Sequence, residues 1–309
     1  MSESKGELLA EVVRDGVVES RHSGHLILLA ADGRVQLSRG NPSLLIYPRS
    51  SIKAIQASAM IRAGMKLEPR LLALVAASHS GSEMHQSGAR EILSLANLDE
   101  SALQNATDKP LGEEDRINWG NNPGTSLAQN CSGKHAGMLL SCVTNGWPIE
   151  SYLNPEHPVQ RACKDEFETL AHEEVSHISI DGCGAPLFLI SLLGLARAIQ
   201  SLTISKDPIH QSVLRACRDF PEMVAGEGRL TTRKMREIPG LFVKEGAEGV
   251  QVASLSDGRT LALKVDDGSS RALGVLLVAA LQEFGVDSLS ESTPIYGGRQ
   301  VLGSVRANI

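Results

Sequence analysis

Aromatic residues are scarce in this chain of 309 residues, where Phe, Trp and Tyr together make up 3% of the sequence. A core must therefore be built mainly from Leu, Ile, Val, Ala and Met, and the hydrophobic content of 42% is enough for one large core or two smaller ones. The same scarcity argues against rows of aromatic side chains that stack on single-stranded bases.

Runs of Lys and Arg are also missing, and the formal net charge is -6. Nucleic acids and anionic lipid surfaces attract clusters of basic side chains, so we expect neither as a partner. No apolar stretch reaches the roughly 18 residues that a membrane span needs. The charged N-terminus has no apolar segment of the kind found in secretory signals. These absences predict a cytoplasmic protein that acts on a small molecule.

The five cysteines are odd in number, widely spaced and without a C-x-x-C pair. This pattern fits reduced thiols in a cytoplasm better than a disulfide framework. If cysteines bind a metal ion here, the fold must bring them together.

The order of the predicted elements indicates a mixed α/β (α+β) protein. Residues 25–40 read as two strands around a turn at Asp32-Gly33, and residues 241–268 read as three short strands that precede an apolar helix. We expect a single catalytic domain over residues 1–309. Its antiparallel sheet would come from both chain ends, about 10–50 and 240–309, with a helical and loop region at about 51–239.

The first candidate for chemistry is Ser50 with Lys53 in the segment PRSSIK. A serine and a lysine at this spacing at the start of a helix lie on one face, so the amine could take the proton of the hydroxyl. Only a neutral lysine can do this, which requires burial or nearby cations. The alternative is that Ser50 caps the helix and Lys53 is solvated.

Two later segments extend this pattern. Ser78 and Ser80 follow a buried helix in ASHSG, where they could relay a proton or hold a substrate; otherwise they form a polar turn. Lys264 lies in a strand between apolar neighbours, so its side chain points to the other face, towards solvent or a cleft. The order Ser-x-x-Lys, Ser-x-Ser and strand lysine is typical of serine acyl-transfer enzymes.

Two cysteine segments, QNCSGKHAGM and SIDGCGAP, could form a metal site. Cys131 and Lys134 share the first segment, and Cys183 lies between two glycines in the second. Two thiolates and one neutral amine would suit Zn²⁺ with a water as the fourth ligand. In the alternative, Lys134 pairs with Asp181 and both cysteines are buried free thiols. The spacing leaves both interpretations open.

Six segments together carry a family resemblance: PRSSIK, ASHSG, QNCSGKHAGM, DGCGAP, PEMVAGEGR and LKVDDG. Their order and approximate spacing resemble the Rhizobium-type L-asparaginases, the inducible, thermolabile asparaginase II family, from Gly16 to about Gly274. The resemblance implies a fold similar to serine β-lactamases and glutaminases. It also implies a homodimer, and hydrolysis of L-asparagine to L-aspartate and ammonia.

Carried over by motif, the resemblance implies two serine–lysine pairs, Ser50 with Lys53 and Ser78 with Lys264. Lys53 would activate Ser50 for attack on the side-chain amide, and the second pair would relay a proton to the departing ammonia. The resemblance further implies a zinc site that supports substrate binding, with the ligands Cys131, Lys134 and Cys183. The remaining candidates near the substrate are Arg49, Ser80, Asp181 and His135, with Ser132 behind them and Arg229 or Glu227 from PEMVAGEGR.

The sequence departs from the family pattern in two places. Ala54 instead of Pro follows Lys53, and SHSGSE has one additional residue before Glu83. The second change leaves the partner of Lys264 open between Ser78 and Ser80, and we favour Ser78 because it directly follows the buried helix.

Two other functions are compatible with these residues. One is a glutaminase or another acyl-transfer enzyme of the same fold, because a pocket's discrimination of one methylene, ~1–3 kcal/mol, is invisible in a sequence. The other is a non-enzymatic zinc-binding protein with structural cysteines, which would need the metal in order to fold.

Overall fold

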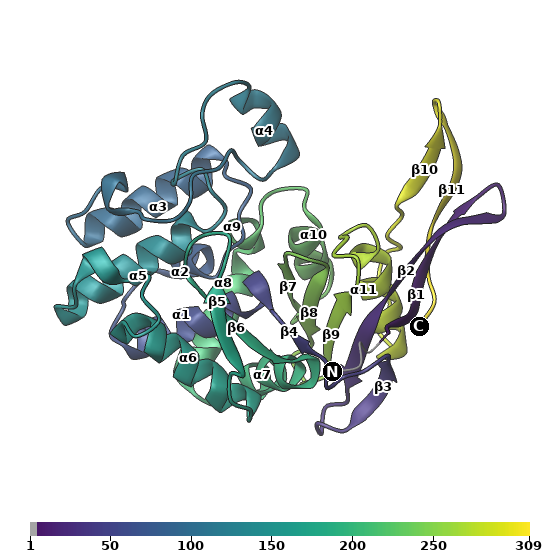
Figure 1. The fold of residues 1–309 in the computed structure, drawn as a ribbon, viewed down its shortest axis with the longest axis horizontal. Helices are drawn as coiled ribbons and strands as arrows, with labels where there is room; N and C mark the ends of the chain where they lie inside the picture. Colours follow the sequence, from purple (N-terminus) through teal and green to yellow (C-terminus); the bar gives the residue numbers. More distant parts are fainter. Residues whose placement is uncertain (1–4) are drawn as a thin grey trace.

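The computed structural model describes residues 5–309, which form a large antiparallel sheet, a helical region and a small second sheet (Figure 1). The strands are β1 (Glu7–Arg14), β2 (Val17–Leu29), β3 (Val35–Arg39), β4 (Leu45–Ile46), β5 (His177–Ile180), β6 (Pro186–Ser191), β7 (Phe242–Gly246), β8 (Val250–Ser254), β9 (Thr260–Val265), β10 (Pro294–Gly297) and β11 (Gln300–Ala307). The α-helices are α1 (Lys53–Arg62), α2 (Pro69–Val75), α3 (Glu83–Leu95), α4 (Glu113–Trp119), α5 (Ser132–Asn145), α6 (Pro158–Ala171), α7 (Leu192–Ile204), α8 (Pro208–Asp219), α9 (Pro221–Val224), α10 (Leu230–Glu237) and α11 (Leu273–Glu283). Three 3-10 helices complete the set: η1 (Arg49–Ile52), η2 (Glu100–Ala102) and η3 (Ile149–Ser151).

The large sheet contains strands from both ends of the chain. Its order is β10-β11-β1-β2-β9-β8-β7, and β3 pairs with the far half of β2. All these pairs are antiparallel, and β2 meets β9 with His25 opposite Lys264 and Leu28 opposite Leu261. The predicted fold class, a mixed protein with an antiparallel sheet from both chain ends and a helical region between them, is confirmed.

The predicted hairpin around Asp32-Gly33 corresponds to β2 and β3, and Gly33 has the positive φ of 84° that a tight turn favours. Other strands were not predicted. β1 and the first half of β2 carry many charged and polar residues, and together with β10 and β11 they form the strands that project from the body in Figure 1. The first half of β2 is polar on both faces, and the buried residues of β1 fall in adjacent pairs, so neither segment shows the apolar alternation from which a strand is predicted.

The helical region contacts the sheet at the end where β7, β8 and β9 lie. α7 packs against β2, β8 and β9, and η1 packs against β7 and β8. Ser50 in η1 is therefore placed at the junction of the helical region and the sheet. Within residues 5–309, no helix combines the length and the apolar character needed to cross a membrane.

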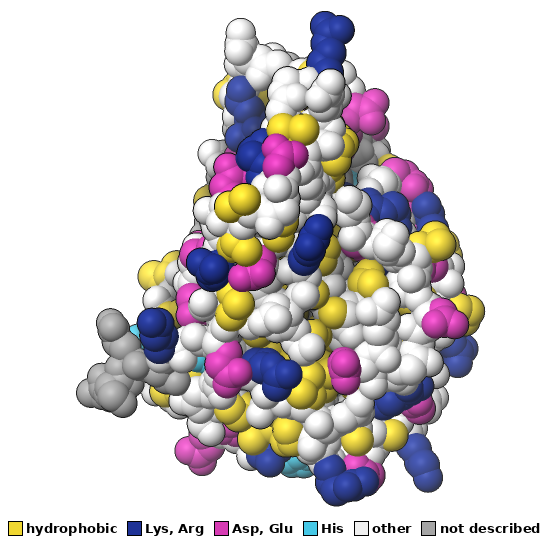
Figure 2. Space-filling model, turned by 90° about the vertical axis from the view of Figure 1, so that its right-hand side faces the viewer, with side chains coloured by type: hydrophobic (Ala, Val, Ile, Leu, Met, Phe, Trp, Pro, Cys, Tyr) yellow, Lys and Arg dark blue, Asp and Glu magenta, His cyan; other side chains and the backbone are white. Residues whose placement is uncertain are grey.

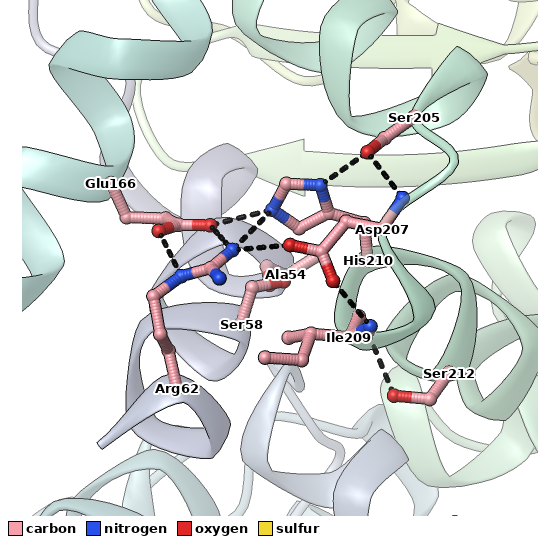
Figure 3. A network of polar contacts seen from close by, with 9 residues as sticks. All are labelled: Ala54, Ser58, Arg62, Glu166, Ser205, Asp207, Ile209, His210 and Ser212. Carbon is pink, nitrogen blue, oxygen red and sulfur yellow. Dashed lines mark hydrogen bonds and ion pairs between the residues drawn. The ribbon is translucent and has the colours of Figure 1, made fainter.

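A polar network at the far end of α1 fixes that end of the helix (Figure 3). The Arg62 guanidinium pairs with Glu166 of α6 at 2.9 Å and with Asp207, just before α8, at 2.7 Å. The His210 ring contacts the same Glu166 carboxylate and the Ser205 hydroxyl. Because α1 begins at Lys53, this network anchors the end of the helix opposite to that lysine.

Candidate active site

The Ser78 hydroxyl lies between two lysine amines. Lys244 Nζ donates a hydrogen bond to Ser78 Oγ over 2.7 Å, and Lys53 Nζ lies 3.3 Å from the same oxygen. All three residues are buried, with exposed fractions of 8% for Ser78, 1% for Lys53 and 2% for Lys244. We call these three residues the lysine–serine cluster.

Three separate elements bring the cluster together. Ser78 follows α2, whose apolar residues are buried, and it begins the polar turn before α3. Lys53 is the first residue of α1, and its amine also donates to the Ala77 carbonyl at 2.5 Å and lies 3.1 Å from Cys131 Sγ. Lys244 comes from β7, which packs against η1 and so faces the start of α1.

Burial favours the neutral form of the Lys244 amine. Loss of hydration places the pKa of Lys244 well below its usual value, and the nearby Lys53 and Arg229 cations lower that pKa further. Glu245, the next residue, acts in the opposite direction on the pKa but is outweighed. Lys244 is therefore suited to be neutral and to accept a proton from the Ser78 hydroxyl.

The predicted pairing of Lys264 with Ser78 or Ser80 differs from the structure. Lys264 Nζ donates to the backbone carbonyls of Glu248 and Val265 at 2.7 and 2.6 Å. Its side chain is half-buried at the centre of the sheet, beside β2 and β8. The amine that reaches Ser78 belongs to Lys244 instead, one strand beyond β8.

Ser50 lies in η1, one turn before Lys53, and is half-buried. The Lys53 amine is directed to Ala77, Ser78 and Cys131, so its hydrogen bonds do not include the predicted partner Ser50. The neighbouring Ser51 hydroxyl donates to the Pro48 carbonyl, whereas the Ser50 hydroxyl has no hydrogen bond to another part of residues 5–309. The expected serine cap on this helix is not formed, because η1 precedes α1 without a side-chain cap.

Arg49 immediately before Ser50 has a positive φ of 52°, an uncommon conformation for a residue other than glycine. Its guanidinium Nε donates to Asp181 Oδ1 at 2.7 Å. This ion pair holds the backbone before Ser50 against the loop between β5 and β6. Arg49 and Asp181, two of the predicted substrate-binding residues, therefore contact each other.

Cys131, Lys134 and Cys183 are gathered in one buried place, although they come from the start of α5 and the β5–β6 loop. Lys134 Nζ lies 3.3 Å from Cys183 Sγ, and Cys183 Sγ lies 3.7 Å from Asp181 Oδ2. A hydrogen bond between the two thiols lowers the pKa of Cys183 to about 5 and raises the pKa of Cys131 to about 12. We call these three residues the cysteine–lysine group.

The donor set of the cysteine–lysine group fits a zinc ion. Two sulfur atoms and one nitrogen are ligands that Zn²⁺ accepts, and they leave one position open. The described part of the chain holds no group of three or more His, Cys, Asp or Glu side chains arranged for a metal. Lysine would therefore have to supply the third ligand.

Ser80 and His135 lie outside the cluster. The Ser80 hydroxyl donates to the Ala225 carbonyl at 2.9 Å and borders a pocket of about 550 Å³ that also contacts Arg229. Gly226 has to be a glycine here, because a Cβ would lie 2.0 Å from Ser80 Oγ. The His135 ring is fully buried against the Tyr152 hydroxyl at 2.8 Å, and burial holds its pKa well below the usual value.

The segment PEMVAGEGR contributes Arg229 to the surroundings of Ser78. Arg229 Nη1 donates to the Ser78 carbonyl at 2.7 Å, and Nη2 donates to Glu245 Oε2 at 3.1 Å. Arg229 therefore connects the backbone of Ser78 to β7, next to Lys244. Glu227, the other candidate from this segment, is exposed and pairs with Arg236.

Sequence reasoning missed Lys244. Its local signal was present, because Lys244 follows apolar residues in a predicted strand, as Lys264 does. Nothing in that local pattern distinguishes a strand at the edge of the sheet from one at its centre. Which of the two lysines contacts a serine depends instead on the residues that lie beside its strand in the folded protein. These residues come from α1 and from the turn after α2.

Comparison with known proteins identifies the family of the chain. The family model described as L-asparaginase II matches residues 10–302. Among solved structures, the chain is similar to a β-lactamase from Mycobacterium bovis, with a TM-score of 0.47 and 13% identity over 84% of this chain and 94% of that chain.

The chain is also similar to Mglu in its native form, with a TM-score of 0.47 and 11% identity over 85% of this chain. The match spans 64% of Mglu, less than two thirds of its length. No curated protein matches the chain. Similarity to solved structures at this level carries no conclusion about function, whereas the family model spans most of the sequence. The chain therefore belongs to the L-asparaginase II family and is an amidohydrolase of the L-asparaginase class.

Proposed function

We propose that this protein hydrolyses L-asparagine to L-aspartate and ammonia through an acyl-enzyme formed on Ser50. The observation that carries the proposal is the Ser78 hydroxyl between the buried amines of Lys53 and Lys244. A proton can pass between the two lysine amines through the Ser78 hydroxyl, since both amines contact it. Lys53, the first group of this path, lies one helical turn after Ser50.

Exposure favours Ser50 as the nucleophile over Ser78. Ser50 is half-buried and its hydroxyl is free, whereas Ser78 is 8% exposed and its hydroxyl already accepts from two lysines. A nucleophile must reach the substrate, while a relay group must contact the groups between which it passes a proton. The strained φ of Arg49 supports the same choice, because strained backbone is often found beside reacting groups.

The proposed reaction has two halves. The Ser50 oxygen attacks the side-chain amide carbon of asparagine. Protonated Lys53 passes its proton through Ser78 to neutral Lys244 and takes the Ser50 proton in its place, and Lys244 delivers its proton to the leaving nitrogen. The C–N bond breaks, ammonia departs and a Ser50 ester remains. A water molecule then gives up a proton to the same path and attacks the ester, which releases aspartate and restores the Ser50 hydroxyl.

Charged groups beside Ser50 provide a binding site for the amino acid itself. Arg49 and Asp181 lie next to the proposed nucleophile with opposite charges, which are complementary to the α-carboxylate and α-ammonium of the substrate. The pKa of Asp181 is below its usual value, because Lys134 and Arg49 outweigh the effect of burial, so the carboxylate is charged when the substrate binds. Asparagine and glutamine share both groups, so selectivity between them depends on the depth of the pocket.

A zinc ion in the cysteine–lysine group is part of the proposal. When bound, it would supply a fixed positive charge beside the substrate site. The ligands would be Cys131, Lys134 and Cys183, and Lys134 would have to lose its proton to serve as one. The contact between Lys53 and Cys131 links this group to the lysine–serine cluster.

The direct test is a coupled assay of ammonia release from L-asparagine and from L-glutamine, run with and without added zinc. We expect faster release from asparagine, with zinc lowering KM more than it changes kcat. Zinc content of the purified protein, measured by mass spectrometry of the metal, should fall in Cys131→Ser and Cys183→Ser. No ammonia from either amide would contradict the proposal, and no bound zinc would contradict the metal site alone.

The choice of nucleophile has a separate test. The protein is mixed with L-asparagine, quenched in acid within milliseconds and digested, and the peptides are searched for an added aspartyl group. We expect the adduct on Ser50 in the wild type and in Ser78→Ala, in which it forms slowly, and no adduct in Ser50→Ala. An adduct on Ser78 would reverse the roles of the two serines.

A homodimer is also part of the proposal, through the family resemblance. The projecting strands carry exposed apolar residues, Val17, Tyr296 and Val301, and Figure 2 shows apolar and charged side chains interspersed on the face that includes these strands. Light scattering after gel filtration should give twice the mass of one chain. We expect Val301→Asp to lower that mass if this face forms the interface.

A further inference from the structure

A pocket of about 670 Å³ lies between the end of α7, helix α8 and the turn that joins β8 to β9. None of the residues of the lysine–serine cluster or of the cysteine–lysine group lines it. Three cationic side chains do: Lys206, Arg215 and Arg218. Positive charge from three residues at one pocket suggests an anionic ligand.

Arg218 is the residue of this pocket whose buried N–H groups lack hydrogen-bond acceptors in the described part of the chain. Its Nε and Nη2 atoms are buried and have no hydrogen-bond partner among the described residues. Buried N–H groups without a hydrogen-bond partner are costly, because they lose hydration and gain no hydrogen bond in return. Burial accordingly lowers the pKa of Arg218 from its usual value.

Arg62, at the end of α1, is more exposed than Arg218 and still has carboxylate partners (Figure 3). Arg62 pairs with two carboxylates, those of Glu166 and Asp207. Ser205, which belongs to the same network, also lines the pocket of Arg218. The network stops at that pocket, so Arg218 is left without the carboxylates that Arg62 has.

The acidic residues at the pocket do not replace an external anion. Asp257 is bound by its neighbour Arg259, with 2.7 Å between Nη2 and Oδ2. Asp219 is exposed at the end of α8 and stabilises the charge of Arg218 without a hydrogen bond to it. Arg215 is one helical turn before Arg218, so both side chains leave α8 on the same side.

We propose that this pocket binds a small oxyanion, a phosphoryl or carboxylate group, with Arg218 as the principal ligand and Arg215 and Lys206 beside it. The planar fork of N–H donors on arginine matches two oxygens of either group. The exposed Ser256 hydroxyl on the opposite wall is available to a third oxygen. The pocket is separate from the proposed catalytic residues, so the proposal does not depend on the reaction.

The test is calorimetric titration of the purified full chain with inorganic phosphate and, separately, with acetate, at an ionic strength held constant with sodium chloride. We expect saturable binding of at least one of the two anions, and the tighter one identifies the class of ligand. Arg218→Met should weaken that binding at least tenfold. Arg161→Met, which removes an exposed arginine on α6, should leave it within twofold.

Thermal unfolding provides a second reading that does not depend on detecting heat. Without the anion, Arg218→Met should unfold at the same temperature as the wild type or at a higher one, because an unpaired buried charge has been removed. The anion should then raise the unfolding temperature of the wild type and not that of the variant. If Arg218→Met does not fold, Arg215→Met must weaken binding severalfold.

Two results would overturn the proposal. One is the absence of saturable binding of both anions to the wild type. The other is an Arg218→Met variant that unfolds at a lower temperature without anion and is stabilised by phosphate as much as the wild type. That result would make Arg218 a purely structural residue.

Discussion

Lys244 and Lys264 occupy similar positions in the sequence and very different ones in the structure. Each lies in a short strand of the same sheet, on either side of β8. Lys244 is 2% exposed and donates to the Ser78 hydroxyl at 2.7 Å. Lys264 is half-buried and donates to two backbone carbonyls, so its amine is used to hold the chain together.

This difference shows that the position of a strand in the sheet determines which residues its lysine can contact. β7 is the last strand of the sheet, and η1 and α10 pack against it. A side chain on β7 can therefore meet residues from the helical region. β9 lies between β2 and β8, and Lys264 reaches the turn after β7 instead. Burial lowers the pKa of both amines, yet only Lys244 has a hydroxyl to act on.

The largest expected effect comes from removing Ser78 and Lys244 singly and together. If they act as one proton path, Ser78→Ala and Lys244→Met should each lower kcat by about 10³-fold, since general acid–base groups contribute about 10² to 10⁴. The double variant should be no slower than the worse single variant, because groups that act as a unit are not additive. Multiplied losses in the double variant would mean that the two residues act independently.

A second, intermediate effect concerns the pH dependence of kcat/KM. Activity requires neutral Lys244, so it should rise with pH through the lowered pKa of that residue. Arg229 lowers this pKa and Glu245 raises it. We therefore expect Arg229→Gln to move the acidic limb to higher pH and Glu245→Gln to move it to lower pH, each by about one unit. Lys264→Met should leave the limb in place, and shifts in the same direction for both charge variants would contradict the assignment.

The smallest expected effect is on stability. Lys264→Met removes two hydrogen bonds from a charged amine that is partly screened by solvent, so the free energy of unfolding should fall by about 1 kcal/mol. Lys66→Met, which changes an exposed lysine, serves as the control and should stay within about 0.5 kcal/mol of the wild type. Denaturant unfolding measures both. An equal change in the two variants would mean that the carbonyl contacts of Lys264 contribute nothing.

Much of the fold could be predicted from the sequence, because apolar alternation and turn residues are local signals. The three strands within 241–268 and the hairpin at Asp32-Gly33 carry such signals. β1, β10 and β11 could not be predicted in this way. The buried residues of β1, Leu9, Ala10, Val12 and Val13, fall in adjacent pairs, and β10 and β11 bury only Ile295 and Val305, so none of the three strands shows regular apolar alternation.

The candidate site could be predicted only in part, and for a related reason. Short motifs identify residues that share a turn, which is why Cys131 and Lys134 were found together. The contacts of Lys244 and Arg229 with Ser78 join distant parts of the chain, and no motif in the sequence encodes them. The family pattern predicts that a lysine late in the chain pairs with a serine in the middle, but it does not identify the strand that carries this lysine.

The central claim is that Lys244, and not Lys264, completes the site at Ser78. The most direct test measures ammonia release from L-asparagine by Lys244→Met and Lys264→Met side by side, after circular dichroism has shown that both are folded. We expect a loss of about 10³-fold in kcat for Lys244→Met and a change of no more than about threefold for Lys264→Met, because a stability change of about 1 kcal/mol leaves most of the protein folded. A folded Lys264→Met variant without activity beside an active Lys244→Met variant would contradict the account.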